Sequence, residues 1–442
     1  MARNAKWYEL DNAAKIVPST AQGSDTRVFR LCCELKEEVD GEILQEALDR
    51  TIKEFPHFNC ILKKGLFWYY LEASARKAKV TQENLPPCSA IYTDGKRNLL
   101  YRVFYYRNRI NLEMFHVLAD GTGGFIFLKS LVAHYLVKRY GLSEEIVPTE
   151  RSSVSEKTGD AFRHFYEDRK TKSCLEEWPS GRAYRLKGER NDDFGVQLLE
   201  GTVSLKKFLE VAHQYKATIA IFTVALYVEA ILPEMAVRER KLPIVTSVPV
   251  NLRNYFPSGT TRNFFGVINV PFQPLDYDGS LESIVDKIRQ SFETMLTEEE
   301  IFRTMNAYAA LEHNWAVKMV PLFLKDQGIA GMNFLMRRGI TSTVSNVGKV
   351  EMPKEMEPYI SKFSSFMAAE STQVCISSFG DALTFGIATA FKTHTVSMNF
   401  FRRMAELGIP VELATTDYDA YEGQGGDRRA VLRKMPDKDS GK

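Results

Sequence analysis

Hydrophobic and polar positions in the first third of the chain predict strands that alternate with helices. Asp40-Gly41 precedes an amphipathic helix, whose apolar residues recur at helical spacing along one face. A second, longer apolar helix is expected over residues 125–140. The expected strands are residues 28–37, 57–64, 66–72, 99–106 and 109–116, of which 57–64 and 66–72 form a hairpin.

A second set of elements follows residues 141–195, a polar, glycine-interrupted stretch that predicts a connection between two lobes. The expected strands are 196–204, 243–252, 264–272, 341–346, 373–379, 382–389 and 409–413, and the expected helical regions are 206–214, 219–232, 280–338 and 398–407. We therefore predict an N-terminal α/β lobe over residues 1–180 and a C-terminal α/β lobe over 181–415. Residues 416–442 are charged, glycine-rich and aperiodic, which predicts a disordered tail.

Composition narrows the functional classes. With 44% hydrophobic and 26% charged residues over 442 positions, the chain can bury more than one core and is not disordered in bulk. A net charge of +2 gives no reason to expect a nucleic-acid partner. The six cysteines lack CxxC spacing, so we expect neither a metal site nor a disulfide framework. The first ten residues lack the apolar run of a secretory signal, and a cytoplasmic location is predicted.

Candidate chemistry lies at the end of the strand over residues 109–116. Strand parity puts His116 on the same face as Leu112 and Met114, toward a buried surface or a cleft. An imidazole can act as a base there if its other ring nitrogen is held by a hydrogen bond. Asp120 and Gly121 follow in a sharp turn. From the residues alone, an ordinary Asp-Gly turn beside a structural histidine remains the alternative.

Two other site types are disfavoured. The segment GTGGFI after Asp120 fits neither of the common glycine-rich phosphate-binding patterns. No GxSxG nucleophile motif occurs in the sequence, which argues against a serine hydrolase.

The segment HVLADG, residues 116–121, resembles the HxxxDG signature of the chloramphenicol acetyltransferase-like superfamily, which includes condensation domains, wax-ester synthases and alcohol acetyltransferases. The chain resembles the bacterial alcohol-acetyltransferase-like branch over nearly its whole length, notably in residues 55–72, 248–270 and 342–348. It departs from many condensation domains and wax-ester synthases at Phe115, where they carry a second histidine, and it lacks the DFGWG segment of the plant acyltransferase branch. These departures leave the substrate open.

The resemblance implies two lobes, each a mixed β-sheet flanked by helices, with an active-site tunnel between them. It implies transfer of an acyl group from an acyl-coenzyme A thioester to an alcohol or amine. His116 would be the general base, with no covalent intermediate. Ser345, with Asn346 beside it, is the candidate donor of a hydrogen bond to the oxyanion, and an ordinary polar strand end is the alternative.

In the same superfamily the aspartate of the motif is structural and pairs with an arginine. Asp120 is therefore expected to hold the loop under His116. Arg30 is the expected partner, with Arg253 and Arg262 as alternatives.

The resemblance implies no bound cofactor, because the acyl-coenzyme A or phosphopantetheinyl thioester is a co-substrate. A condensation-type enzyme that takes its acyl group from a carrier protein in trans is a second hypothesis. A non-catalytic member that binds a lipid or a partner protein is a third. The apolar, cation-bearing stretch 315–336 predicts ordinary core packing, an acyl pocket or peripheral contact with a membrane. A monomer and a dimer are both compatible with the sequence.

Overall fold

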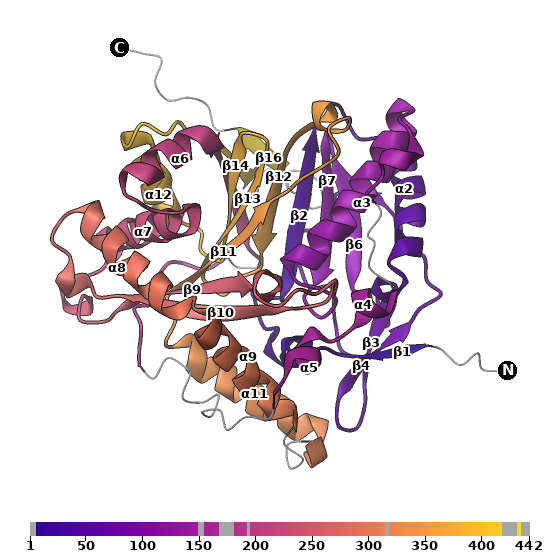
Figure 1. Cartoon of the computed structure of the whole chain (residues 1–442), viewed down its shortest axis with the longest axis horizontal. Helices are drawn as coiled ribbons and strands as arrows, with labels where there is room; N and C mark the ends of the chain where they lie inside the picture. The colour runs from indigo at the N-terminus through magenta and orange to yellow at the C-terminus, as the bar shows by residue number, and fades with distance from the viewer. Residues whose placement is uncertain are drawn as a thin grey trace.

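Two large mixed sheets form the framework of the protein (Figure 1). The structure is a computed structural model that describes residues 6–148, 154–167, 181–191, 195–313, 318–417 and 431–434. Within these residues the first large sheet has the order β12 (Ile360–Met367), β2 (Val28–Leu35), β7 (Arg109–Phe115), β6 (Tyr101–Tyr106) and β5 (Thr81–Gln82). The second has the order β10 (Phe265–Phe272), β9 (Ile244–Asn251), β11 (Ser342–Lys349), β13 (Thr372–Phe379), β14 (Ala382–Thr389), β8 (Gln197–Ser204), β15 (Glu412–Asp417) and β16 (Val431–Lys434).

Helices cover each large sheet and close a separate hydrophobic core against it. In the first half, α2 (Gly41–Glu54) packs on α3 (Gly121–Tyr140), which lies against β2 and β7. In the second half, the helices on the sheet are α6 (Leu205–Gln214), α7 (Ile219–Ile231), α8 (Leu281–Met295) and α12 (Thr395–Glu406). The other described helices are α1 (Val17–Thr20), α4 (Val154–Thr158), α5 (Ala161–Phe165), α9 (Glu298–His313) and α11 (Leu322–Arg337). The predicted α/β class, with mixed sheets flanked by helices, is confirmed.

Aspartates cap two of the helices of the first half. The side chain of Asp40 accepts hydrogen bonds from the backbone N–H groups of Glu42 and Ile43, which fixes the start of α2. Asp120 does the same for α3 by accepting from the N–H of Gly123 at 2.9 Å. The cap explains why α3 begins at Gly121, four residues before the helix expected from the apolar pattern.

The strand β12 crosses from the second half of the chain into the first sheet, beside β2 (Figure 1). Polar Ser364 and Ser365 are buried in it, because both faces of the strand are covered. Gly386 of β14 packs so closely that a Cβ there would lie 2.0 Å from the carbonyl oxygen of Ser365. The sequence pattern did not predict β12, since a strand covered on both faces has no alternation of polar and apolar positions. Residues 181–415 thus supply a strand to the sheet of the N-terminal half.

A buried ion cluster joins the two large sheets. The carboxylate of Glu200, on β8, lies 2.6 Å from Nη2 of Arg109 on β7 and 2.6 Å from Nζ of Lys362 on β12. Burial alone would raise the pKa of Glu200, but the two cations outweigh it and hold that pKa well below the usual range. The carboxylate is therefore charged, and the cluster links strands from three separate parts of the chain.

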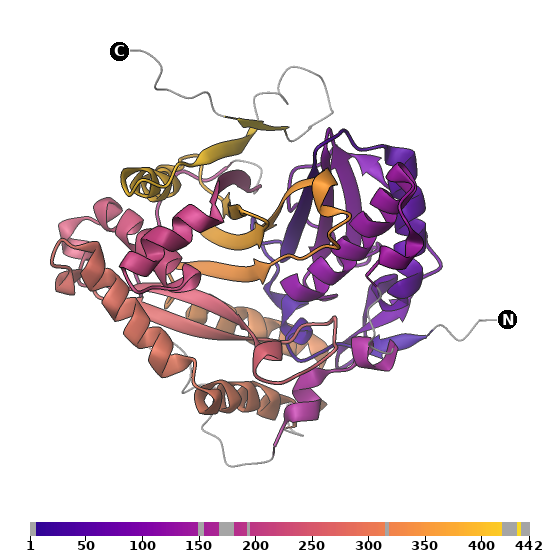
Figure 2. The same cartoon turned by 45° about the horizontal axis from the view of Figure 1, so that its top comes forward.

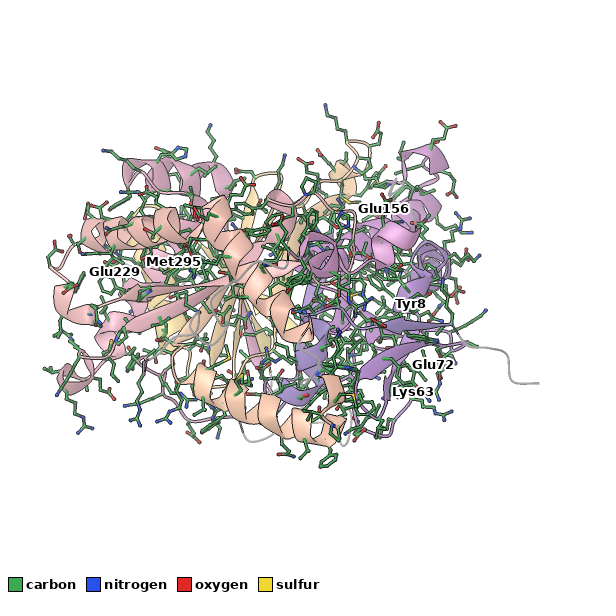
Figure 3. The ribbon with its side chains drawn as sticks, turned by 60° about the horizontal axis from the view of Figure 1, so that its bottom comes forward. Tyr8, Lys63, Glu72, Glu156, Glu229 and Met295 are labelled. Atoms are coloured by element: carbon green, nitrogen blue, oxygen red, sulfur yellow. The ribbon has the colours of Figure 1, made fainter. Side chains whose placement is uncertain are left out.

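A small third sheet, in the described residues, has the order β1 (Trp7–Glu9), β4 (Tyr69–Ala73) and β3 (Cys60–Lys64), and it contains the predicted hairpin. Tyr8, Glu72 and Lys63, labelled in Figure 3, lie on its three strands. The Nζ atom of Lys63 lies 3.5 Å from Oε1 of Glu72, so this surface is charged.

The expected disordered tail contains ordered strand residues. β15 extends to Asp417, and β16 (Val431–Lys434) pairs antiparallel with it at the end of the second sheet (Figure 2). For these residues the structure has strands where the sequence predicted disorder, because backbone pairing to an existing sheet edge does not require an apolar pattern. Residues 418–430 and 435–442 lie outside the described residues.

Long apolar helices are few in the described part of the chain. None of them alone has the length and apolar composition to span a membrane. The pair Leu205–Gln214 and Ile219–Glu234, bent by 78°, meets that test in length and composition when taken together.

Candidate active site

His116 lies in the turn directly after β7, and both halves of the chain hold its ring. Its backbone N–H donates to the carbonyl of Arg27 at 2.9 Å. The ring of Phe29, on β2, meets the imidazole edge-on with 5.3 Å between ring centroids. Phe265, the first residue of β10, contacts it from the other half at 5.6 Å. The residues Ile110, Leu112 and Met114 that share its predicted face are fully buried in the first core, as parity implied.

Asn263 determines which nitrogen of His116 carries the proton. Its Oδ1 lies 2.9 Å from His116 Nδ1. Its Nδ2 donates to the carbonyl oxygen of His116 and to Oδ2 of Asp11, each at 3.1 Å. A carbonyl oxygen can only accept, so this orientation of the amide is fixed, and Oδ1 must face the imidazole. The Nδ1 atom of neutral His116 therefore carries the proton, and its Nε2 carries the lone pair.

Asp11 and Arg262 support Asn263 from behind. Oδ2 of the fully buried Asp11 also accepts from the backbone N–H of Asn263 at 3.4 Å and lies 3.5 Å from Nε of Arg262. Burial raises the pKa of Asp11, while the charge of Arg262 and the hydrogen bonds oppose that rise. Arg262, expected as an alternative partner of Asp120, is thus the partner of Asp11.

The environment of His116 favours the neutral imidazole. Burial lowers its pKa, and the positive charge of Arg27 adds to this, whereas Asp120 and the hydrogen bond to Asn263 act in the opposite direction. His116 keeps part of its surface accessible, and its Nε2 makes no hydrogen bond to any residue that the structure describes. This arrangement gives an accessible, unprotonated nitrogen near neutral pH.

Asp120 ties the start of α3 to the loop between β9 and β10, residues 252–264. One carboxylate oxygen caps α3, and the other accepts from Nη1 of Arg253 at 2.8 Å and from the N–H of Phe264 at 2.9 Å. Both partners of the ion pair are nearly buried, with side chains 7% and 11% exposed. The carboxylate accepts hydrogen bonds from three donors, so its role in this structure is to hold the loop against α3.

Arg253 holds the backbone of that loop in place through several hydrogen bonds. Its guanidinium also donates to the backbone carbonyls of Thr260, Arg262 and Phe264. The prediction that Arg30 pairs with Asp120 is wrong. Arg30 follows Phe29 on β2, so its side chain points to the opposite face of the sheet, where it forms buried ion pairs with Glu83 at 2.6 Å and Glu113 at 3.2 Å.

The glycines after Asp120 differ in what they permit. A Cβ at Gly123 would lie 1.9 Å from the backbone oxygen of Thr261, so only glycine allows α3 and the loop to meet this closely. At Gly121 a Cβ would make ordinary contacts of 3.5 Å with Val347. The close backbone approach that the sequence led us to expect at the glycines after Asp120 thus depends on Gly123 more than on Gly121 of the motif.

The end of β11 approaches the start of α3 through Val347, two residues after Ser345. Ser345 is half-buried, and its hydroxyl makes no hydrogen bond to a described residue. Asn346 is exposed, and its Oδ1 accepts from the N–H of Gly348 at 3.0 Å, next to a β-bulge. Asn346 is therefore used locally, while the hydroxyl of Ser345 is available.

A cavity of about 640 Å³ has Leu10, the residue before Asp11, in its wall. Its other lining residues are Trp7, Glu9, Lys15, Trp68, Tyr69, Tyr70, Arg163 and Lys318. The lining is aromatic, and its cations outnumber its carboxylates. In the described residues, no group of three or more His, Cys, Asp or Glu side chains is placed to hold a metal ion.

Sequence reasoning missed Asn263, Asp11 and the two phenylalanines around His116. Asn263 stands in the stretch 248–270 that carries the resemblance, next to Arg262. No local pattern distinguishes it, because its contact with His116 joins residues 147 positions apart. Only the fold brings the two together.

Sequence comparisons find no family model and no curated protein that matches the chain. Solved structures do match. TRI101 from F. graminearum, in complex with coenzyme A and deoxynivalenol, has a TM-score of 0.63 at 11% identity, covering 92% of this chain and all (100%) of that one. TRI3 trichothecene 15-O-acetyltransferase from Fusarium sporotrichioides has a TM-score of 0.59 at 12% identity, covering 90% and 93%.

A condensation domain is similar to the same degree. The first condensation domain of the CDA synthetase has a TM-score of 0.57 at 14% identity, covering 92% of this chain and 97% of that one. Identities this low carry information about the fold alone, and all three alignments span nearly the full length of both chains. The chain therefore shares the α/β fold of these acetyltransferases and of this condensation domain, which is the fold that the resemblance implied.

Proposed function

We propose that this chain is an acyltransferase that moves an acyl group from a thioester to a hydroxyl or amine, with His116 as the general base. The observation that carries the proposal is the hydrogen bond from His116 Nδ1–H to Asn263 Oδ1 at 2.9 Å. It leaves Nε2 unprotonated and without a partner among the described residues, which a base that receives a proton from a substrate requires.

In the proposed reaction the acceptor O–H or N–H donates to Nε2 of His116. Nε2 takes the proton as the acceptor oxygen or nitrogen attacks the thioester carbonyl carbon. The imidazolium that forms is stabilised by Asn263 Oδ1, which already accepts from Nδ1–H. Collapse of the tetrahedral intermediate breaks the carbon–sulfur bond, and Nε2–H returns the proton to the leaving sulfur. General-base help of this kind contributes about 10²–10⁴ in rate.

The oxyanion of that intermediate needs a hydrogen-bond donor. Ser345 remains our candidate, because its hydroxyl has no partner among the described residues and β11 ends near the start of α3. Asn346 is a weaker candidate, since its side chain already accepts a hydrogen bond from Gly348.

We propose acyl-coenzyme A as the donor. A similar fold binds coenzyme A in TRI101, and the cavity lined by Leu10 carries Lys15, Arg163 and Lys318 against the single carboxylate of Glu9, which suits an anionic ligand. The similarity to a condensation domain supports the second candidate, in which a carrier protein presents the thioester on a phosphopantetheine arm.

The test is acyl transfer by the purified protein. Acyl-coenzyme A of several chain lengths is incubated with a panel of alcohols and amines, and release of free thiol is followed. The His116→Ala variant should lose at least about 100-fold of the acceptor-dependent release, with an unchanged circular dichroism spectrum. His213→Ala, at an exposed position on α6, is the matched control and should keep full activity.

Three outcomes would redirect the proposal. Unchanged turnover in His116→Ala would contradict the general-base role. Transfer from acylated carrier protein, with none from any acyl-coenzyme A, would replace the proposed donor with the condensation-type alternative. Release from neither donor with any acceptor would favour a non-catalytic binding protein.

A further inference from the structure

The helix α11 presents an apolar face to solvent along its whole length. Four large side chains at positions i, i+1, i+11 and i+12 share one face of the helix. They are Phe323, Leu324, Phe334 and Leu335, which are 63%, 52%, 64% and 61% exposed. The positions between them on that face are Gln327, Gly328 and Gly331, so no charged side chain interrupts it.

Two of the three charged residues of the same helix, Lys325 and Asp326, point into the protein. Lys325 is 7% exposed, and its Nζ donates to the carbonyl of Phe67 at 3.0 Å and lies 3.4 Å from the ring centroid of Trp68. The carboxylate of Asp326 accepts from Ser19 Oγ at 2.7 Å and from the Tyr69 hydroxyl at 3.0 Å. This is the reverse of the usual surface helix, whose apolar side faces the core.

The apolar face continues beyond the helix. Met319, just before α11, is 63% exposed, and Leu66, at the tip of the β3–β4 hairpin, is 72% exposed. The hairpin is fixed there, because the N–H of Leu322 donates to the carbonyl of Leu66 at 2.8 Å. We call these six residues the α11 face: Leu66, Met319, Phe323, Leu324, Phe334 and Leu335. The body of the same hairpin carries the charged Lys63 and Glu72 pair instead (Figure 3).

Charge at the α11 face is positive. Asp326 is the one carboxylate in α11, and it is turned inward. Exposed Lys318 precedes the helix, and Arg337, its last residue, and Arg338 lie at the other end. Arg337 is partly neutralised by Asp25 and by Glu370 at 2.7 Å, so Lys318 and Arg338 contribute most of the excess. An apolar strip with cations at both ends complements an anionic lipid surface.

We propose that α11 docks the protein on an anionic membrane, lying flat with the α11 face among the acyl chains nearest the headgroups. The two apolar pairs of α11 are roughly 17 Å apart along the helix axis, so a flat partner can contact both at once. The helix lies at the lower edge of the molecule, away from the second core (Figure 1). The proposal is independent of the acyltransferase function.

The test is sedimentation of the intact protein with vesicles. One set contains phosphatidylcholine with phosphatidylglycerol, and the other contains phosphatidylcholine alone. Wild type should bind the anionic set more tightly, and added salt should weaken that difference. The double variant Phe323→Ser/Phe334→Ser should lose about tenfold or more in affinity, because each side chain no longer buries apolar surface in lipid.

The matched control is Val237→Ser/Leu275→Ser, which removes two residues that are 83% and 71% exposed elsewhere on the molecule. It should bind vesicles like wild type. Equal vesicle binding by all three proteins, or no binding by any, would overturn the proposal. A concentration-dependent dimer in sedimentation velocity that the Phe323→Ser/Phe334→Ser variant loses, without vesicle binding, would instead identify the α11 face as a contact between two copies of the chain.

Discussion

Two histidines of the first half, His116 and His57, contact the same β9–β10 loop in opposite ways. Nε2 of His57 lies 2.8 Å from Oγ1 of Thr261, whose hydroxyl donates to the carbonyl of Lys157. Thr261 therefore accepts, and His57 carries its proton on Nε2, while its Nδ1 is buried and has no hydrogen-bond partner in the described part of the chain. His116 carries its proton on Nδ1, held by Asn263, and leaves Nε2 accessible.

The comparison separates a candidate base from a structural histidine. Burial lowers the pKa of both residues, and it lowers the pKa of His57 to about 3. A lowered pKa is therefore no mark of catalysis in this protein. What differs is access to the second ring nitrogen. His57 is 5% exposed and its Nε2 is bonded to the buried Thr261, whereas His116 is partly exposed and its Nε2 lies on the side of the ring away from Asn263.

Asp120→Ala should have the largest effect, because it releases the loop that both histidines contact. Arg253 would lose its ionic partner, and the N–H groups of Phe264 and Gly123 would lose their acceptor. Breaking such a buried pair costs about 3–5 kcal/mol, which urea unfolding measures directly. Asp381→Ala, which removes an exposed carboxylate that caps α6, is the control and should cost much less. Equal losses in the two variants would mean that the Asp120–Arg253 ion pair adds nothing beyond a helix cap.

Asn263→Leu should come next, with kcat lower by about 10- to 100-fold, the value of one hydrogen bond to a group that becomes charged. The hydrogen bond raises the pKa of His116, so its loss should lower that pKa. The acid limb of the kcat/KM profile should then move to lower pH while the plateau falls. Asn254→Leu, at an exposed position in the same loop, is the control. A lower plateau with an unmoved acid limb would indicate that Asn263 acts only on folding.

His57→Gln should have the smallest effect, and only on stability. Glutamine can still donate to Thr261 but does not titrate. In wild type the unfolded chain protonates His57 below about pH 6.5, whereas the folded protein does so only near 3. Stability from this residue is therefore complete above pH 6.5 and is lost as the pH falls toward 3.

The free energy of unfolding of the His57→Gln variant, minus that of wild type, should be about 2 kcal/mol larger at pH 5 than at pH 7.5. Urea unfolding of both proteins at both pH values measures this difference. Its acyl transfer at neutral pH should be unchanged. A stability difference that is the same at both pH values would show that His57 is not held neutral. A large loss of transfer would remove the distinction between the two histidines.

Much of the first half follows from local pattern. Residues close in sequence determine the strand β2, the cap at Asp40 and the β3–β4 hairpin. They also determine which face of β7 is buried. Such signals fail for β12, whose two faces are both buried. They also fail for the charged residues of β2 and β7, where parity alone cannot reveal that Arg30 meets Glu83 on the face opposite His116.

The sequence by itself determined the α/β class and the end of β7 at a turn that carries His116. Each depends on hydrogen bonding and burial within a few residues. Only the tertiary structure decided that Arg253 pairs with Asp120, that Asn263 fixes the His116 tautomer, and that α11 turns its apolar side outward. The two hydrogen-bonded pairs join residues more than 100 positions apart, and the exposed side of α11 depends on which face the rest of the molecule covers. The local sequence pattern contains no information about either.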